Sequence, residues 1–232
     1  MKKITYLLTL LFTASIIFTS CRDNDDNGNG NGNGYGNGNN NNPGIGNPTA
    51  TTDPGVLIGY IDGNPIRWAT RNVAAPGTFA QNATNAGMFF QWNRRTGWSA
   101  TDPLVSSPAG STWNGTIPTG GNWARTNDPC PPGWRVPTRA EFDALHNAGS
   151  EWETRSGVNG RVFGSGANTL FLPAAGLRST NGTLGNVGTT GSYWSSWARD
   201  ASHGWFLFFG SGGSGVGADF RSNGFSVRCV AE

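Results

Sequence analysis

Lysine is almost absent from this sequence. Lys2 and Lys3 are the only lysines among its 16 Lys and Arg residues, which leaves 14 arginines against 14 Asp and Glu. A nucleic-acid-binding protein needs a clear excess of basic residues, so this balance argues against that partner. Histidine is equally scarce: His146 and His203 are the only two, and neither stands at metal-ligand spacing from a cysteine. We therefore expect no metal site, no cofactor and no bound nucleic acid.

The first 20 residues have the pattern of a secretory signal. Two lysines precede the apolar run 7–18, which is too short to cross a bilayer comfortably. The run ends in Phe-Thr-Ser before Cys21, and small residues directly before a cysteine resemble a bacterial lipobox. That resemblance implies cleavage after residue 20 and acylation of the Cys21 thiol and amine. The alternative is an ordinary secretory signal followed by an incidental cysteine.

Residues 21–54 consist mainly of Asn and Gly and contain almost no apolar side chain. Such a segment buries too little surface to offset its ordering entropy, so we expect a flexible tether. Asp23, Asp25 and Asp26 resemble the acidic signal that sends some Bacteroidota lipoproteins to the outer face of the outer membrane. Plain solubility is the alternative role for these acids. We expect a lipid-anchored protein of the outer membrane, exposed at the cell surface.

Residues 55–232 are long enough for one domain with a real core. The chain holds 36 Gly and 10 Trp, which favours a loop-rich fold with aromatic plugs and little helix. With Cys21 acylated, Cys130 and Cys229 remain, and an even pair in an exported protein favours a disulfide. It would close a loop of about a hundred residues, which entropy models value at about 4 to 5 kcal/mol.

Two strand-like stretches open this domain. Residues 56–60 and 65–69 flank Asp62-Gly63, a pair typical of a two-residue hairpin turn. Residues 87–92 are a short aromatic strand candidate. From 93 to 129 we expect long loops pinned by three indoles, those of Trp98, Trp113 and Trp123.

One helix is clearly signalled. Thr138 as N-cap and Glu141 three residues later form a capping box, and Gly149 suits the position just past the end. We expect residues 151–154 to add a second helical turn. Further strands are expected at 168–173, 191–197, 204–209 and 225–230. In the last of these, Phe225, Val227 and Cys229 share the inward face.

Four ordered motifs carry a family resemblance: CPPGWRVPTRAEFDAL, FLPAAGLR, GSYWSS and NGFSVRCV. Together they resemble the Fibrobacter succinogenes major paralogous domain over residues 59–230. The resemblance implies an α+β protein with a C-type lectin-like fold. It implies a small twisted antiparallel sheet, one or two helices, long Trp/Gly-rich loops and paired N- and C-terminal strands.

The stretch 197–222 is similar to the variable segments that diversity-generating retroelements rewrite in lectin-fold proteins. Those elements randomise template adenines, so an AAC codon becomes NNC, where N is any base. No codon that ends in C encodes Lys, Glu, Gln, Met or Trp. We interpret Trp205, Leu207 and Phe209 as fixed core on one strand face, with Phe206 and Phe208 partly accessible on the other. The candidate binding residues are Trp197, Arg199, Asp200, His203, Phe206, Phe208, Gly210, Gly213, Ala218, Asp219 and Phe220. The alternative is a strand buried on both faces and followed by a flexible glycine loop.

We hypothesise a non-enzymatic surface protein that binds a protein, a glycan or a phage surface through this segment. One alternative is a calcium-independent glycan-binding adhesin without diversification. The Glu-Pro-Asn and Gln-Pro-Asp motifs of calcium-dependent lectins are missing. Another is an oxidoreductase resembling the formylglycine-generating enzyme, but no nucleophile or acid pair converges with the cysteines.

Overall fold

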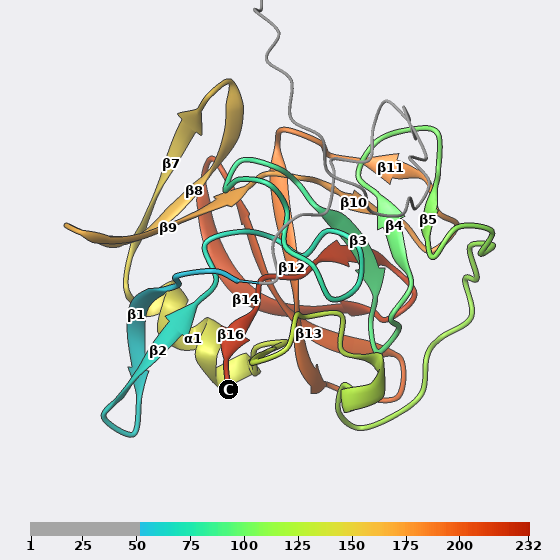
Figure 1. Cartoon of the computed structure of the whole chain (residues 1–232), viewed down its shortest axis with the longest axis horizontal. Helices are drawn as coiled ribbons and strands as arrows, with labels where there is room; N and C mark the ends of the chain where they lie inside the picture. The colour runs from blue at the N-terminus through green and yellow to red at the C-terminus, as the bar shows by residue number, and fades with distance from the viewer. Residues whose placement is uncertain (1–51) are drawn as a thin grey trace, which may run out of the picture. The chain divides into compact units, whose positions relative to one another are not determined.

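The computed structural model describes residues 52–232 (Figure 1). The predicted signal peptide, the predicted acylation site Cys21 and the predicted tether as far as residue 51 lie outside these residues. The last residues assigned to the tether are bound to the domain. The carboxylate of Asp53 accepts hydrogen bonds from the backbone N–H groups of Gly55 and Thr70, each at 2.9 Å, and pairs with Arg71 at 3.0 Å. Within the described residues, no helix is long and apolar enough to span a membrane.

The described part is mostly β-sheet with one short α-helix. Its elements in chain order are β1 (Val56–Ile61), β2 (Asn64–Trp68), β3 (Met88–Gln91), β4 (Gly97–Ser99), β5 (Ser106–Ser107), the 3-10 turn η1 (Arg125–Asn127), β6 (Trp134–Arg135), α1 (Arg139–Asn147), β7 (Ser150–Arg155), β8 (Val158–Ser165), β9 (Asn168–Pro173), β10 (Leu177–Arg178), β11 (Leu184–Gly185), β12 (Thr190–Ala198), β13 (His203–Gly210), β14 (Gly213–Phe220), β15 (Gly224–Ser226) and β16 (Val230–Ala231). The expected small α+β architecture is therefore present.

Three sheets are formed. The largest has nine strands, with β14, β13, β12, β15, β3, β4 and β5 in that order and β10 and β11 attached beside β15. A four-stranded sheet has the order β1-β2-β16-β6, and β7-β8-β9 form a meander. Figure 1 shows the helix α1 beside the β1–β2 hairpin. The hairpin β13–β14 thus lies at one edge of the largest sheet, and β5 lies at the other.

The predicted hairpin at the start of the domain is confirmed. Strands β1 and β2 pair around Asp62 and Gly63, which have φ values of +51° and +79°. Two successive positive φ values match the right-handed strand twist, and a glycine at the second position adopts them without steric cost. The first hairpin also pairs with the end of the chain, because Val230 of β16 lies opposite Trp68 of β2.

The predicted helix is confirmed, and the second helical turn is wrong. Thr138 accepts a hydrogen bond from the N–H of Glu141, whose carboxylate accepts one from the N–H of Thr138 at 2.6 Å. Gly149, with φ of +81°, ends the helix. Residues 151–154 instead belong to β7, where exposure alternates with a period of two and Trp152 is half-buried. A left-handed glycine followed by this alternation starts a strand rather than another turn of helix.

A separate hydrophobic core packs against each face of the largest sheet. On the face toward α1, here called the helix face, Tyr193, Leu207 and Phe209 pack with Phe142 and Leu145 of the helix. On the opposite face, here called the disulfide face, other buried side chains surround the cystine. They include Trp92, Trp194, Phe206, Phe225, Val227 and Cys229. The inward orientation predicted for Phe225, Val227 and Cys229 is confirmed, since all three are fully buried.

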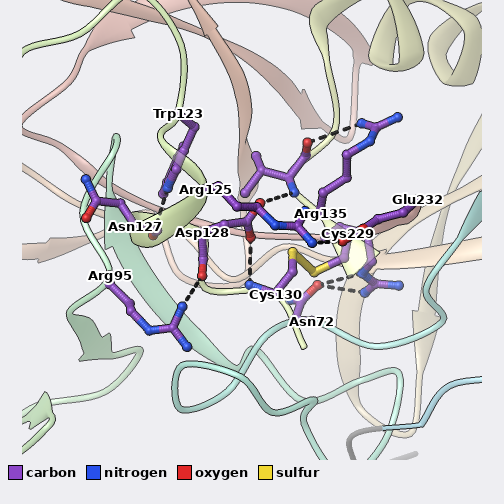
Figure 2. Close-up of a disulfide and its surroundings, with 12 residues drawn as sticks. Asn72, Arg95, Trp123, Arg125, Asn127, Asp128, Cys130, Arg135, Cys229 and Glu232 are labelled. Carbon is purple, nitrogen blue, oxygen red and sulfur yellow. Dashed lines mark hydrogen bonds and ion pairs between the residues drawn. A yellow bond between two sulfur atoms is a disulfide. The ribbon is translucent and has the colours of Figure 1, made fainter. Parts of the chain in front are cut away.

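The predicted disulfide is present between Cys130 and Cys229, 99 residues apart (Figure 2). Next to it, Asp128 accepts hydrogen bonds from the N–H groups of Cys130 at 2.9 Å and Val136 at 3.1 Å. Burial raises the pKa of the Asp128 carboxyl, although these two hydrogen bonds act in the opposite direction. The cystine thus ties the loop before α1 to the strand region at the end of the chain.

The predicted loops around 93–129 are held by their tryptophans. Trp98 is buried and its ring lies 5.1 Å from that of Trp113. The indole N–H of Trp113 donates to the carbonyl of Thr180 at 2.8 Å, and that of Trp123 donates to Asn127 at 2.9 Å. The indoles anchor these loops to each other and to the turn after β10.

Buried guanidinium groups were not anticipated from the sequence. Arg178, Arg221 and Arg228 are almost completely inaccessible. Arg228 donates to the Asn72 side chain at 2.7 and 2.9 Å and to the Ala69 carbonyl at 3.1 Å. Burial lowers the pKa of Arg228 to about 10, so it remains charged at neutral pH.

Replacing both cysteines by alanine should lower the free energy of unfolding by about 4 kcal/mol, because the unfolded chain regains the entropy of a long loop. Urea unfolding followed by tryptophan fluorescence measures this difference. Wild-type protein treated with a thiol reductant under the same conditions is the matched control. An unchanged unfolding midpoint in the double variant would show that the cystine does not stabilise the fold.

Candidate functional site

The strand pairing decides which candidate residues can act together. Directly opposed residues of antiparallel strands share a face, and successive residues alternate between faces. Phe208 lies opposite Gly215, and Gly204 opposite Asp219, on the disulfide face; His203 lies opposite Phe220 on the helix face. The predicted residues of β13 and β14 therefore divide into two groups. Phe206, Phe208, Gly210, Gly213 and Asp219 lie on the disulfide face, and His203, Ala218 and Phe220 lie on the helix face.

Phe208 is the exposed aromatic of the disulfide-face group. It is 45% exposed, whereas its neighbours Leu207 and Phe209 are buried. Its ring lies over the glycines of β14: a Cβ added at Gly215 would be 2.8 Å from the Phe208 ring, and one at Gly217 would be 3.2 Å away. The glycines therefore make room for the aromatic ring on the surface of the strand.

Phe206 does not lie as expected. It is only 9% exposed and packs against Trp194 and Phe225, with ring centroids 6.0 and 5.0 Å away. The expectation that it would be partly accessible is thus wrong. Because side chains alternate along a strand, Phe206 and Phe208 lie on the same face. The hydrophobic core on that face covers Phe206 but does not extend as far as Phe208. Trp205, expected in the core, is only half-buried and lies under the Arg139 guanidinium at 3.9 Å.

A hollow of about 610 Å³ adjoins Phe208. Most of its lining comes from the β13–β14 hairpin, which contributes Phe208, Gly213 and Asp219 among others. The other lining residues lie on β12 or before it, and they include Leu177, Asn186, Thr190 and Ser192. The hollow combines an aromatic ring, one carboxylate and several hydroxyl and amide groups, which suits recognition by stacking and hydrogen bonding. No sequence pattern singled out the residues before β12, because only the fold brings them to the hairpin.

The other candidates gather at the turn before β13. Trp197 and Phe220 are each 47% exposed, and Arg199 is also exposed. The His203 imidazole contacts the Phe220 ring at a tilt of 32°, with ring centroids 4.7 Å apart. Asp200 closes the turn: it accepts from the N–H groups of Ser202 at 2.8 Å and His203 at 2.9 Å, and lies 2.9 Å from His203 Nδ1.

These contacts determine the charge state of the turn. Hydrogen bonds from the Ser202 backbone and then from the His203 side chain lower the pKa of Asp200 well below its ordinary value. The Asp200 carboxylate therefore stays ionised to a lower pH than a free aspartate, and it lies 3.8 Å from the Arg199 guanidinium. Within residues 52–232, no group of three or more His, Cys, Asp and Glu side chains is arranged to hold a metal ion.

A family model described as a domain of unknown function (DUF8237) matches residues 146–230. The match covers less than half of the chain and runs from the end of α1 into β16, so it includes the whole β12–β14 region. No curated protein and no solved structure matches the chain.

Phe208 and Leu207 should respond very differently to truncation. Leu207→Ala should lower the free energy of unfolding by about 2–5 kcal/mol, because it empties a buried site. Phe208→Ala should change it by less than about 1 kcal/mol, because the ring is on the surface. Urea unfolding of both variants measures the contrast. Equal losses would mean that Phe208 belongs to the core.

Asp200 should stay ionised at acidic pH. Since its folded-state pKa is lowered, its contribution to the turn is complete above its ordinary value of 3.8 and is lost only as the pH falls through the lower folded-state pKa. The carboxyl ¹³C shift of Asp200, followed by NMR titration, should still report the carboxylate at pH 3.8. A midpoint at that pH would mean that the turn is not closed in solution.

Proposed function

We propose that this chain is a ligand-binding protein whose binding surface is the β12–β14 edge of the largest sheet. The observation that carries the proposal is the exposure of Phe208 between buried Leu207 and Phe209. An exposed aromatic on a strand anchored by its two neighbours can contact a ligand, or be exchanged, without disturbing the core. The adjoining hollow and the exposed Trp197, Arg199 and Phe220 extend this surface with residue types that dominate interface energetics.

We further propose that the scaffold is a C-type lectin-like domain of the Fibrobacter succinogenes major paralogous type. The single helix and the pairing of β2 with β16 support this assignment, since the resemblance implied a helix and paired N- and C-terminal strands. On the separate similarity of segment 197–222 to retroelement-diversified segments, we propose that a retroelement diversifies it. The lipobox-like Cys21 and the acids after it support a lipid-anchored protein displayed on the outer membrane.

Binding is favoured over catalysis as the role of the domain. The two cysteines that an oxidoreductase would need are joined to each other and buried, with Cys229 fully inaccessible. The runner-up is a calcium-independent glycan-binding adhesin without diversification, and the observation that favours it is that both an aromatic ring and a carboxylate line the hollow.

Binding should depend on Phe208. We expect the full-length protein to bind members of a glycan array or of a phage-displayed random peptide library, and Phe208→Ala to weaken that binding at least about tenfold, as for an interface hot spot. The control is Leu104→Ala, which removes a similarly exposed apolar side chain between β4 and β5, at the far edge of the sheet. Binding that survives in Phe208→Ala, or the absence of any binding, would contradict the proposal.

Diversification has its own signature in DNA. A near-identical repeat of the codons for 197–222, differing only at adenines and lying beside a reverse transcriptase gene, is the expected finding. If the repeat differed from the gene at the codons of buried Leu207 and Phe209 as well as at the codon of Phe208, diversification confined to surface residues would be contradicted.

A further inference from the structure

The candidate binding residues of the β13–β14 hairpin lie on both of its faces. Phe208 and Asp219 lie on the disulfide face of the β13–β14 hairpin, while His203, Ala218 and Phe220 lie on the helix face. A ligand resting on either face would reach only one group. Both groups are reached together from the outer edge of β14, which is the last strand in the order of its sheet.

The hairpin geometry identifies the backbone groups on that edge. β13 and β14 are joined by a two-residue loop closed by the pair Gly210–Gly213, and such a closing pair is hydrogen-bonded. Bonded pairs then alternate along the ladder, so Val216, Ala218 and Phe220 direct their N–H and C=O groups away from β13. The hydrogen bond of the Phe220 N–H supports this assignment, because it goes to the Asp219 carboxylate at 2.7 Å and not to β13.

The outward groups of Val216 and Ala218 are available to a partner. Apart from the pairing of β14 with β13, no hydrogen bond within residues 52–232 involves the backbone of either residue. Val216 and Ala218 are partly accessible, so these backbone groups can bond to water or to a partner. Natural sheets usually protect such an edge with lysine or proline, and β14, with the sequence GSGVGADF, has neither.

We propose that the edge of β14 takes up an extended segment of a partner protein as an added strand. This inference rests on the proposed function and specifies its ligand class. Backbone hydrogen bonds to Val216 and Ala218 would supply affinity, and alternate side chains of the segment would fall on the two faces and supply specificity.

The chemistry of the partner segment follows from the two faces. On the disulfide face, Gly215 and Gly217 carry no side chain, so a large apolar side chain of the added strand can lie across β14 and reach the Phe208 ring. Asp219, on the same face, is the one charged side chain of β14 and favours Arg or Lys in the segment. A second copy of β14 contains no basic residue, so it would leave Asp219 without a counter-charge.

The test begins with a random peptide library displayed on phage and selected on the full-length protein. Enriched peptides should alternate large apolar residues with other residues and contain Arg or Lys. A synthetic enriched peptide should bind Ala218→Pro at least about tenfold more weakly than wild type by calorimetry, because proline removes an outward N–H. The matched control is Thr154→Pro, which places proline at the equivalent outward position of the exposed edge strand β7 and should change affinity by less than about twofold.

Backbone N-methylation of the peptide, one residue at a time, tests the same contact on the wild-type chain. Loss of binding should alternate along the peptide, because only every second N–H faces β14. Equal tolerance at all positions, unchanged binding to Ala218→Pro, or failure to enrich any peptide would overturn strand addition. Strand addition by a partner protein would also be overturned if, without peptide, the wild-type protein were a dimer and the Ala218→Pro variant a monomer.

The failure of this inference can be told apart from failure of the proposed function. If glycans bind in a Phe208-dependent manner and no peptide does, strand addition is overturned while the binding surface stands. If neither probe binds, both are wrong.

Discussion

The fold depends on charged guanidinium groups that are buried among loop carbonyls. Long irregular segments expose backbone groups that have no strand or helix partner, and a buried orphan among them is costly. Arg178 donates to the carbonyls of Ser99, Thr101 and Gly182 at 2.7–2.8 Å. Arg221 donates to the Gly120 carbonyl at 2.8 Å. One side chain thus satisfies several carbonyls at once, which lets a chain with little regular structure between β3 and β6 pack tightly.

This rigid interior explains how exposed and buried residues can alternate within a few positions of β13. The strand is held on the helix face by Leu207 and Phe209 and on the disulfide face by Phe206, so Phe208 is left to the surface. Because β14 is the outermost strand, side chains on both of its faces and its backbone are available together.

Local signals in the sequence predicted the local structure well. Asp62-Gly63 identified a hairpin and Thr138 with Glu141 identified the helix start, because turns and caps depend on a few adjacent residues. The error at 151–154 arose because Trp152 is the only large apolar residue among these four, and one apolar residue does not reveal a period in the sequence. The exposure of Phe206 was predicted wrongly because the alternation of side chains along a strand indicates which face a residue occupies. It does not indicate how far the hydrophobic core extends over that face. The residues before β12 that line the hollow were missed because only tertiary packing brings them there.

The contacts of Asp53 have a mechanical consequence. Its carboxylate is bound by Thr70, Arg71 and the N–H of Gly55, directly before β1 begins. Tension arriving from the N-terminal side would load this cluster of hydrogen bonds before it reached the sheet. A domain pulled by its leading segment would therefore resist detachment of its first strand, because load would reach Thr70 and Arg71 as well as β1.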